Sequence, residues 1–201
     1  DGAINIIYNE DKAETFGFKV FKLHRVHTQI SRIMLTANNK VVTDAKLEDY
    51  IPEFAEDFEE QVDDKNQKFI LRYYVYGDYL DRNVNNERTD FYFADLPSLE
   101  YPIGKHDIEL KIAQEAKQKM EKEITTRFEK KKEAFRQYVE QNVWYKNYLG
   151  KINFDKVKIN PTEKDIEAEL HRAKYETDLE RQNRAKNILD TIDIKGENLT
   201  Q

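Results

Sequence analysis

The chain has 201 residues and a formal net charge of −6, with 33 Lys and Arg against 39 Asp and Glu. This charge excludes a basic protein that coats nucleic acid through electrostatics alone. The absence of cysteine excludes disulfides, thiolate zinc sites and cysteine nucleophiles. No apolar run reaches about 18 residues and no signal-peptide pattern occurs, so we expect a soluble, cytoplasmic protein without a membrane partner. Because the chain begins with Asp rather than Met, we also expect a piece of a longer protein.

Residues 1 to about 100 carry the patterns of a β-sheet and form the first predicted domain. Apolar and polar residues alternate from Ile4 to Tyr8 and again from Phe16 to Val20, as they do in half-buried strands. The apolar segment 31–42 is interrupted at Asn38 and Asn39, two residues that tolerate the left-handed backbone region. This interruption predicts two strands joined by a tight turn.

The second half of this domain predicts one helix and two further strands. Apolar residues recur with helical spacing over 44–60, which predicts a short helix lying on the sheet even with Pro52 inside the segment. Aromatic and β-branched residues at 68–80, and alternation at 89–93, predict strands. Proline and glycine residues between 96 and 104 then mark a domain boundary near residue 100.

Residues 101–201 form the second predicted domain, a helical arm. Neither Pro nor Gly interrupts 106–149, and apolar residues recur there with helical spacing, which predicts one long amphipathic helix that projects beyond a small domain. A helix-start signature at Asn160–Glu163 predicts a second helix over 161–192. The simplest packing is an antiparallel hairpin that buries both apolar stripes. The stripe of the second helix consists of Ile166, Leu170, Ala173, Leu179, Ile188 and Leu189.

Motifs of the common enzyme classes are absent from the sequence, including phosphate-binding loops, dinucleotide fingerprints, nucleophile elbows and zinc-protease helices. His24 and His27 share one strand-like segment but have no evident third ligand, so we predict no metal site. The lysine-rich stretch 117–136 contains interleaved acidic residues, which favours a solvated helix over a DNA-binding face. The aromatic group Trp144, Tyr145 and Tyr148 is interpreted as hairpin core, with a partner-binding patch as the alternative.

The connection from Asp81 to Phe91 is longer and more polar than a hairpin requires, with three Asn and two Arg between predicted strands. Arg88 lies where the next strand is predicted to begin. A guanidinium held at a rigid sheet edge can bind a phosphate group in a bidentate manner. These residues therefore make Arg88 a candidate phosphate sensor.

Two blocks of the sequence, LTANNKVVTDAKLEDYI and YLDRNVNNERTDFYF, resemble the transducer domain of the GHKL ATPases. The likeness is closest to the MutL mismatch-repair proteins and looser to the heat-shock ninety chaperones, and it covers about residues 15 to 95. The matching positions are Asn38, Lys40 and Asp44 in the first block and Asp81, Asn83, Val84 and Arg88 in the second. The MutL pattern has a His-Pro pair where this chain has Asn85-Asn86.

The resemblance implies an α+β fold of the ribosomal-protein-S-five domain-two-like class, which is a sheet crossed by a helix. It also implies that this domain follows directly after a nucleotide-binding domain. It implies that Arg88 contacts the γ-phosphate of ATP held with Mg²⁺ by that neighbouring domain. Arg82 stays an alternative, because the chaperone branch places its arginine elsewhere in the loop. The remaining implied roles are cofactor contact for Asn83 and Arg82 and loop support for Asn38, Lys40 and Asp81.

Taken together, these features predict a fragment of a MutL-like or chaperone-like GHKL ATPase, from DNA repair or phage defence. The fragment is expected to relay the ATP state of an N-terminal ATPase domain, absent from these residues, to the helical arm. By itself it is expected to bind neither ATP nor Mg²⁺. A homodimer, a protein client and DNA stay open as partners. The alternative is a non-enzymatic protein-interaction module with an α/β head and a helical hairpin.

Overall fold

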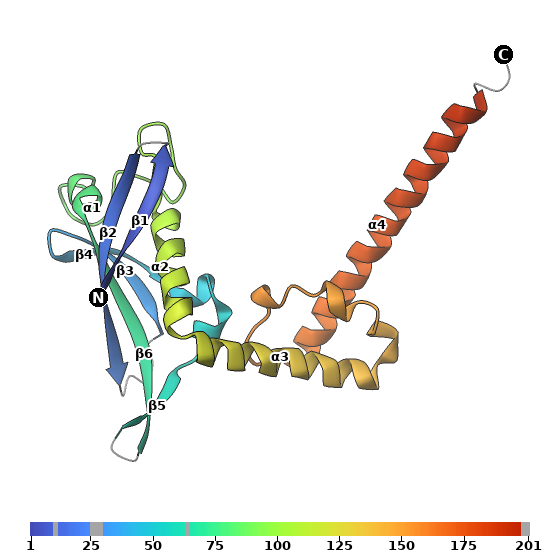
Figure 1. The fold of residues 1–201 in the computed structure, drawn as a ribbon, viewed down its shortest axis with the longest axis horizontal. Coiled ribbons are helices and arrows are strands. Elements are labelled where there is room, and N and C mark those ends of the chain that lie inside the picture. Colours follow the sequence, from blue (N-terminus) through green and yellow to red (C-terminus); the bar gives the residue numbers. More distant parts are fainter. Residues whose placement is uncertain (10–11, 25–29, 63–64, 198–201) are drawn as a thin grey trace. The chain divides into compact units, whose positions relative to one another are not determined.

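The computed structural model describes residues 1–9, 12–24, 30–62 and 65–197, with only the backbone described beyond residue 189 (Figure 1). The chain has an α+β fold with a mixed sheet and a long C-terminal helix. It divides into two compact units, Asp1–Arg127 and Phe128–Gln201. The predicted boundary near residue 100 therefore lies inside the first unit, because the helix that follows it packs against the core of the sheet. No helix among the described residues is long and apolar enough to span a bilayer.

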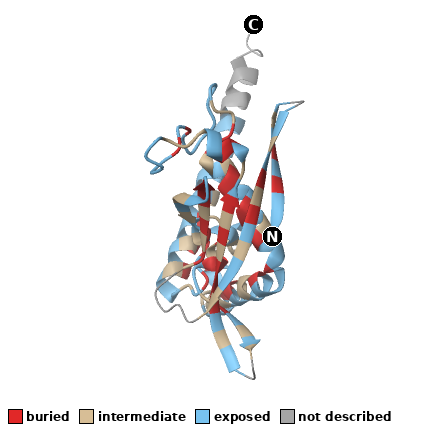
Figure 2. Ribbon diagram, turned by 90° about the vertical axis from the view of Figure 1, so that its left-hand side faces the viewer, coloured by how far each residue is buried: buried red, intermediate tan, exposed pale blue. Residues whose placement is uncertain are grey.

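The first unit is built on a six-stranded sheet in the order β1-β2-β6-β3-β4, with β5 also paired to β6. The central strand β6 is buried on its core face at Leu71, Tyr73 and Val75 (Figure 2). It pairs in parallel with β3, and the other pairings are antiparallel. The strands are β1 (Gly2–Asn9), β2 (Lys12–His24), β3 (Arg32–Ala37), β4 (Lys40–Lys46), β5 (Phe58–Val62) and β6 (Lys65–Tyr76).

The turn between β3 and β4 confirms the prediction made from the Asn-Asn pair. Asn38 and Asn39 have φ angles of 48° and 63°, both in the left-handed region. Two consecutive residues with positive φ match the twist of the flanking antiparallel strands. The pair therefore fixes the register of this hairpin.

We expect Asn39→Ala to lower the free energy of unfolding by about 1 kcal/mol, because alanine tolerates the left-handed region poorly. Asn39→Gly should raise it slightly, since glycine adopts positive φ without a steric cost. Urea denaturation followed by circular dichroism measures both changes. An unchanged midpoint for Asn39→Ala would contradict this account of the turn.

Two predicted elements of the sheet region are wrong. In place of a helix over 44–60 the chain forms two 3₁₀ turns, η1 (Leu47–Asp49) and η2 (Pro52–Phe54), before strand β5. Ile51 is extended, with φ −139° and ψ 101°, as expected for the residue before a proline, and this breaks the helix. In place of a strand at 89–93 there is a single β-bridge between Val84 and Phe91.

The prediction of one helix over 106–149 is also wrong, because the helical conformation is interrupted at Met120 and ends at Gln141. Helix α2 (Lys105–Lys119) ends at Met120, whose φ of −111° and ψ of 25° leave the helical region, and α3 (Glu121–Gln141) follows. The apolar spacing continues through this break, so periodicity alone could not reveal it. Helix α3 ends where the side chain of Asn142 donates to the carbonyl of Tyr138. Short 3₁₀ turns then lie at 143–145, 149–151 and 154–156.

The second unit has its own apolar core, which joins the end of α3 to the first turns of α4 (Glu163–Glu197). The core residues are Phe135, Val139, Tyr145, Val157, Ile166 and Leu170. The predicted stripe continues only to Ala173: Leu179, Ile188 and Leu189 are 43%, 54% and 62% exposed. This part of α4 extends past the segments that pack against its beginning.

Side chains in the second unit correct two further interpretations. Lys131 belongs to the stretch predicted to be solvated, yet it is fully buried and donates to the carbonyl of Val157 at 3.0 Å. Tyr145 is buried and hydrogen-bonded to Nε2 of His171 at 2.9 Å, as predicted for a core residue. Trp144 is 68% exposed, so the core prediction is wrong for this residue.

Helix α2 is attached to the η1 turn through a buried carboxyl group. Glu109 accepts a hydrogen bond from the hydroxyl of Tyr50, whose ring lies 5.5 Å from that of His106. Burial raises the pKa of Glu109, and the negative charge of Asp95 adds to this effect, while the Tyr50 bond opposes it. The folded state therefore favours the protonated carboxyl more than the unfolded chain does.

Glu109→Gln should remove the pH dependence that the Glu109 carboxyl gives to the free energy of unfolding. The contribution of Glu109 is fully present below its unfolded pKa, about 4.3, and is lost as the pH rises through its higher folded pKa. The variant lacks this loss, so its stability relative to the wild type should increase across that interval. Urea denaturation at a series of pH values tests this, and a stability difference that stays constant with pH would contradict it.

Candidate functional site

The candidate loop begins at helix α1 (Asp78–Arg82), an element that sequence analysis missed, and ends at Phe93. Aromatic side chains fix both ends in the core of the first unit. The ring of Phe93 lies 4.9 Å from that of Phe91 and 5.2 Å from that of Tyr79. The hydroxyl of Tyr79 donates to the carbonyl of Ile103 at 2.9 Å. The tip between these anchors, residues 86–90, is exposed.

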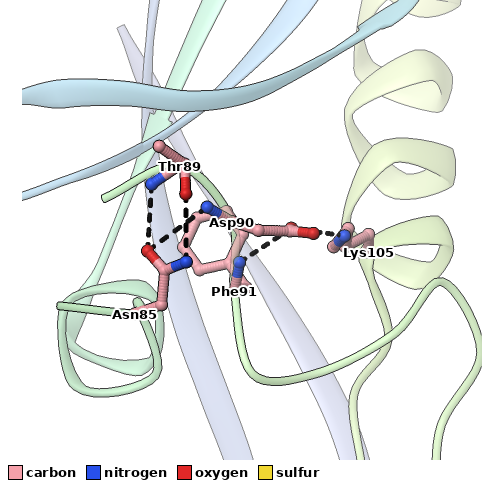
Figure 3. A network of polar contacts seen from close by, with 5 residues as sticks. All are labelled: Asn85, Thr89, Asp90, Phe91 and Lys105. Carbon is pink, nitrogen blue, oxygen red and sulfur yellow. Dashed lines mark hydrogen bonds and ion pairs between the residues drawn. The ribbon is translucent and has the colours of Figure 1, made fainter. Parts of the chain in front are cut away.

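The tip is closed by one side chain, that of Asn85 (Figure 3). Its Oδ1 accepts from the backbone N–H groups of Thr89 at 2.9 Å and Asp90 at 3.4 Å, and its Nδ2 donates to Oγ1 of Thr89 at 3.1 Å. The backbone N–H of Asn85 donates to the carbonyl of Asp90 at 3.0 Å. The loop is therefore held by the Asn85 side chain together with a few backbone hydrogen bonds and one isolated β-bridge, without a regular strand ladder among its described residues.

Arg88 lies at this tip with a φ of 56°, in the left-handed region that a branched or long side chain rarely adopts. Such a conformation costs about 1 kcal/mol or more for a residue other than glycine. The residue is exposed, and its guanidinium has no hydrogen-bond or ion-pair partner in the described part of the chain. The loop thus presents an unpaired guanidinium on a residue whose backbone conformation glycine would adopt more easily.

Arg82, the alternative cation, has a partner. Its Nη2 lies 3.0 Å from Oε1 of Glu14 on β2. An exposed pair of this kind is weak, but it orients the guanidinium toward the sheet. The geometry therefore favours Arg88 over Arg82 as a group that can accept an external anion.

The structure brings together the two sequence blocks that resemble the transducer family. The backbone N–H of Asn38, at the β3–β4 turn, donates to Oδ1 of Asp81 at 2.7 Å. Nδ2 of Asn83 donates to the carbonyl of Tyr79 at 2.8 Å and so caps α1. Lys40 begins β4 as an exposed residue beside this turn. Asn38 and Asp81 are in direct contact, whereas Lys40 makes no described side-chain hydrogen bond or ion pair.

The loop is tied directly to the start of α2. Nζ of Lys105 lies 2.7 Å from Oδ1 of Asp90, and this lysine side chain is only 15% exposed. The lysine bond, assisted by the N–H of Phe91, lowers the pKa of Asp90. A Cβ atom on Gly104 would overlap the carbonyl oxygen of Asp95, so only glycine permits this approach of the helix.

Histidine and carboxylate groups outside this loop form no metal cluster of three or more ligands among the described residues. His24 is paired with Glu60 at 2.6 Å, and that carboxylate also accepts from Lys22. His27, the second histidine of the rejected metal pair, lies outside the described residues.

Sequence reasoning missed Asn85, Gly104 and Lys105 as the residues that hold the loop. Asn85 stood out only as a departure from the family pattern. The available signal was an Asn placed four residues before a Thr in a polar connection, a spacing that lets the amide bond to the backbone of its own loop. The Asp90–Lys105 pair gives no comparable local signal, because it joins two segments across the fold.

The charged residues of the loop are of mixed sign: Arg82 and Arg88 are cationic, whereas Asp81, Glu87 and Asp90 are anionic. A surface of this kind suits contact with one phosphate group better than contact with a polyanion.

Comparison of the chain with protein-family models, curated proteins and solved structures gave no match.

Asn85→Ala should loosen the tip without unfolding the unit. The Thr89 and Asp90 amides lose their acceptor, so we expect their hydrogen exchange to become about tenfold faster, as the loss of roughly 1.5 kcal/mol implies. Asn86→Ala is the matched control, because Asn86 is exposed and makes no described side-chain contact. Equal exchange rates in both variants, measured by NMR, would show that Asn85 does not close the loop.

Proposed function

We propose that this chain is the transducer and helical arm of a GHKL ATPase of the MutL or heat-shock ninety type, with Arg88 as its γ-phosphate sensor. The observation that carries the proposal is the state of Arg88. Its backbone occupies the left-handed region, its guanidinium is open, and the loop beneath it is anchored at both ends. A strained residue that presents an unpartnered charge from a rigid base is typical of a ligand-contact site.

The fold supports the same proposal. Strands β3 and β6 are parallel neighbours, and helix α2 lies against the sheet. This arrangement is compatible with the ribosomal-protein-S-five domain-two-like class, in which a helix crosses a mixed sheet. The contact between Asn38 and Asp81 joins the two sequence blocks on which the family likeness rests.

The chemistry of the proposed contact is electrostatic. ATP and Mg²⁺ belong to the neighbouring ATPase domain, and the residues present here fit only a contact to a terminal phosphate. A fixed guanidinium there stabilises the charge that develops during phosphoryl transfer, and it distinguishes ATP from ADP. Arginine suits this role because its planar fork binds two phosphate oxygens at once.

The relay from the loop follows bonds within the first unit. Movement of the tip acts on Asp90, and through its ion pair on Lys105 at the start of α2. Beyond the break at Met120, the first turns of α3 carry Arg127, whose guanidinium lies 4.1 Å from the ring centre of Phe58. The same guanidinium donates to three backbone carbonyls, those of Glu53, Glu56 and Asp57.

In the longer protein, Arg88→Ala should lower ATP turnover about a hundredfold, because the developing phosphate charge loses its cation. Arg82→Ala is the matched control and should change turnover little. Arg88→Lys should retain part of the activity, since it keeps the charge but not the bidentate fork. Turnover of purified protein, with circular dichroism to confirm folding, decides the matter. Normal turnover in Arg88→Ala would overturn the proposal.

A second candidate function is that of a non-enzymatic protein-interaction module. It is favoured by the exposed Val143 and Trp144, at 64% and 68%, beside a groove of about 280 Å³ that Val139, Val143 and Leu149 help to line. On this reading Trp144→Ala abolishes partner binding and Arg88→Ala is silent. A DNA-binding face on α3 is less favoured, because Lys131 is buried and Arg136 is paired with Glu133.

A further inference from the structure

A cavity of about 400 Å³ lies within the first unit, between the sheet and the last turns of α2. Its volume is in the range of small-molecule sites. None of the residues that line it belongs to the candidate loop, and the proposed relay does not use them. The lining residues that matter are Gly2, Phe18, Tyr73, Glu115, Gln118 and Lys119.

The first notable group is the hydroxyl of Tyr73. The side chain is fully buried, and its oxygen has no hydrogen-bond partner within the described part of the chain. A buried hydroxyl without a partner costs about 1–3 kcal/mol. Burial raises the pKa of Tyr73, and the Glu115 carboxylate raises it further, so the phenol keeps its proton and lies near that carboxylate.

The second feature is a pair of charges on α2. Glu115 and Lys119 are four residues apart, a spacing at which opposite charges on a helix commonly pair. In the described structure they form no ion pair with each other or with any other side chain. From α2 the cavity therefore presents one negative and one positive group with the Gln118 amide beside them, and Asp1 adds its carboxylate and its ammonium to the lining.

The third feature is an aromatic wall. The ring of Phe18 lies 5.8 Å from that of Tyr73. Gly2 is the strand partner of Phe18, and a Cβ atom there would collide with the Phe18 ring. The missing side chain thus makes room for the ring, which offers an apolar surface next to the polar groups.

We propose that this cavity binds a small zwitterion of the free α-amino acid class with an apolar side chain. The ammonium group lies between the Glu115 carboxylate and the Tyr73 hydroxyl oxygen, which gives that oxygen its missing partner. The carboxylate of the ligand meets Lys119 and the Gln118 amide. The apolar side chain packs on the Phe18 ring. This site is independent of the proposed ATPase relay.

The test is titration of the 201-residue chain with L-leucine, followed by NMR chemical shifts and isothermal calorimetry. We expect saturable binding that Tyr73→Phe and Glu115→Gln each weaken about tenfold, as the loss of one hydrogen bond to a charged group implies. Tyr73→Phe should not lower the stability of the free protein, because it removes a hydroxyl without a partner. Lys117→Gln, on an exposed position outside the cavity, is the control and should bind normally.

Two fragments of the ligand complete the test. 3-Methylbutylamine lacks the carboxylate of leucine and 4-methylpentanoate lacks its ammonium, so both should bind more weakly than leucine. The proposal is overturned if leucine does not bind saturably at millimolar concentration. It is equally overturned if Tyr73→Phe binds leucine as well as the wild type, or if either fragment binds as tightly as leucine.

Discussion

The docking of α2 onto the sheet is the constraint on which the first unit depends. Ile108, Ile112 and Ala116 are fully buried against the sheet, so the apolar face of the helix completes the core. The start of the helix is fixed by the close approach of Gly104 to the Asp95 carbonyl. Because this start also holds Asp90 through Lys105, one packed helix positions both the candidate loop and the beginning of α3.

The loop shows how a strained residue is maintained. The left-handed backbone at Arg88 is unfavourable by itself, and it persists because the surrounding contacts define it. The Asn85 amide reaches across Arg88 and bonds to Thr89 and Asp90, the two residues that follow it, while Phe91 and Phe93 are held in the core. A glycine could adopt this backbone more easily, so the side chain is the best reason for arginine at this position.

Sequence reasoning worked where the relevant physics is local. The alternation in β1 and β2 and the tolerance of Asn38 for positive φ are properties of short segments, and both predictions are confirmed. It failed where distant contacts decide. Apolar spacing runs unbroken through Met120, so it did not reveal the end of α2. Nothing near Lys131 in the sequence reveals that its ammonium donates a hydrogen bond to the carbonyl of Val157. For the candidate loop, the polar connection and the family likeness both predict a role for Arg88, which stays a prediction, whereas the contacts of Asn85 and Lys105 required coordinates.

The Asp90–Lys105 pair suits a two-state coupling better than an ordinary surface ion pair does. Its lysine side chain is only 15% exposed, so solvent screens the interaction less than it screens a fully exposed pair. Withdrawal of Asp90, whose own side chain is 56% exposed, would leave a mostly buried ammonium without its carboxylate, which is costly. If Arg88 is drawn toward a phosphate, the loop must either retain this pair and carry α2 with it or break the pair entirely. The first response would pass the movement of the loop to α2, as the proposed relay requires, and the second would not.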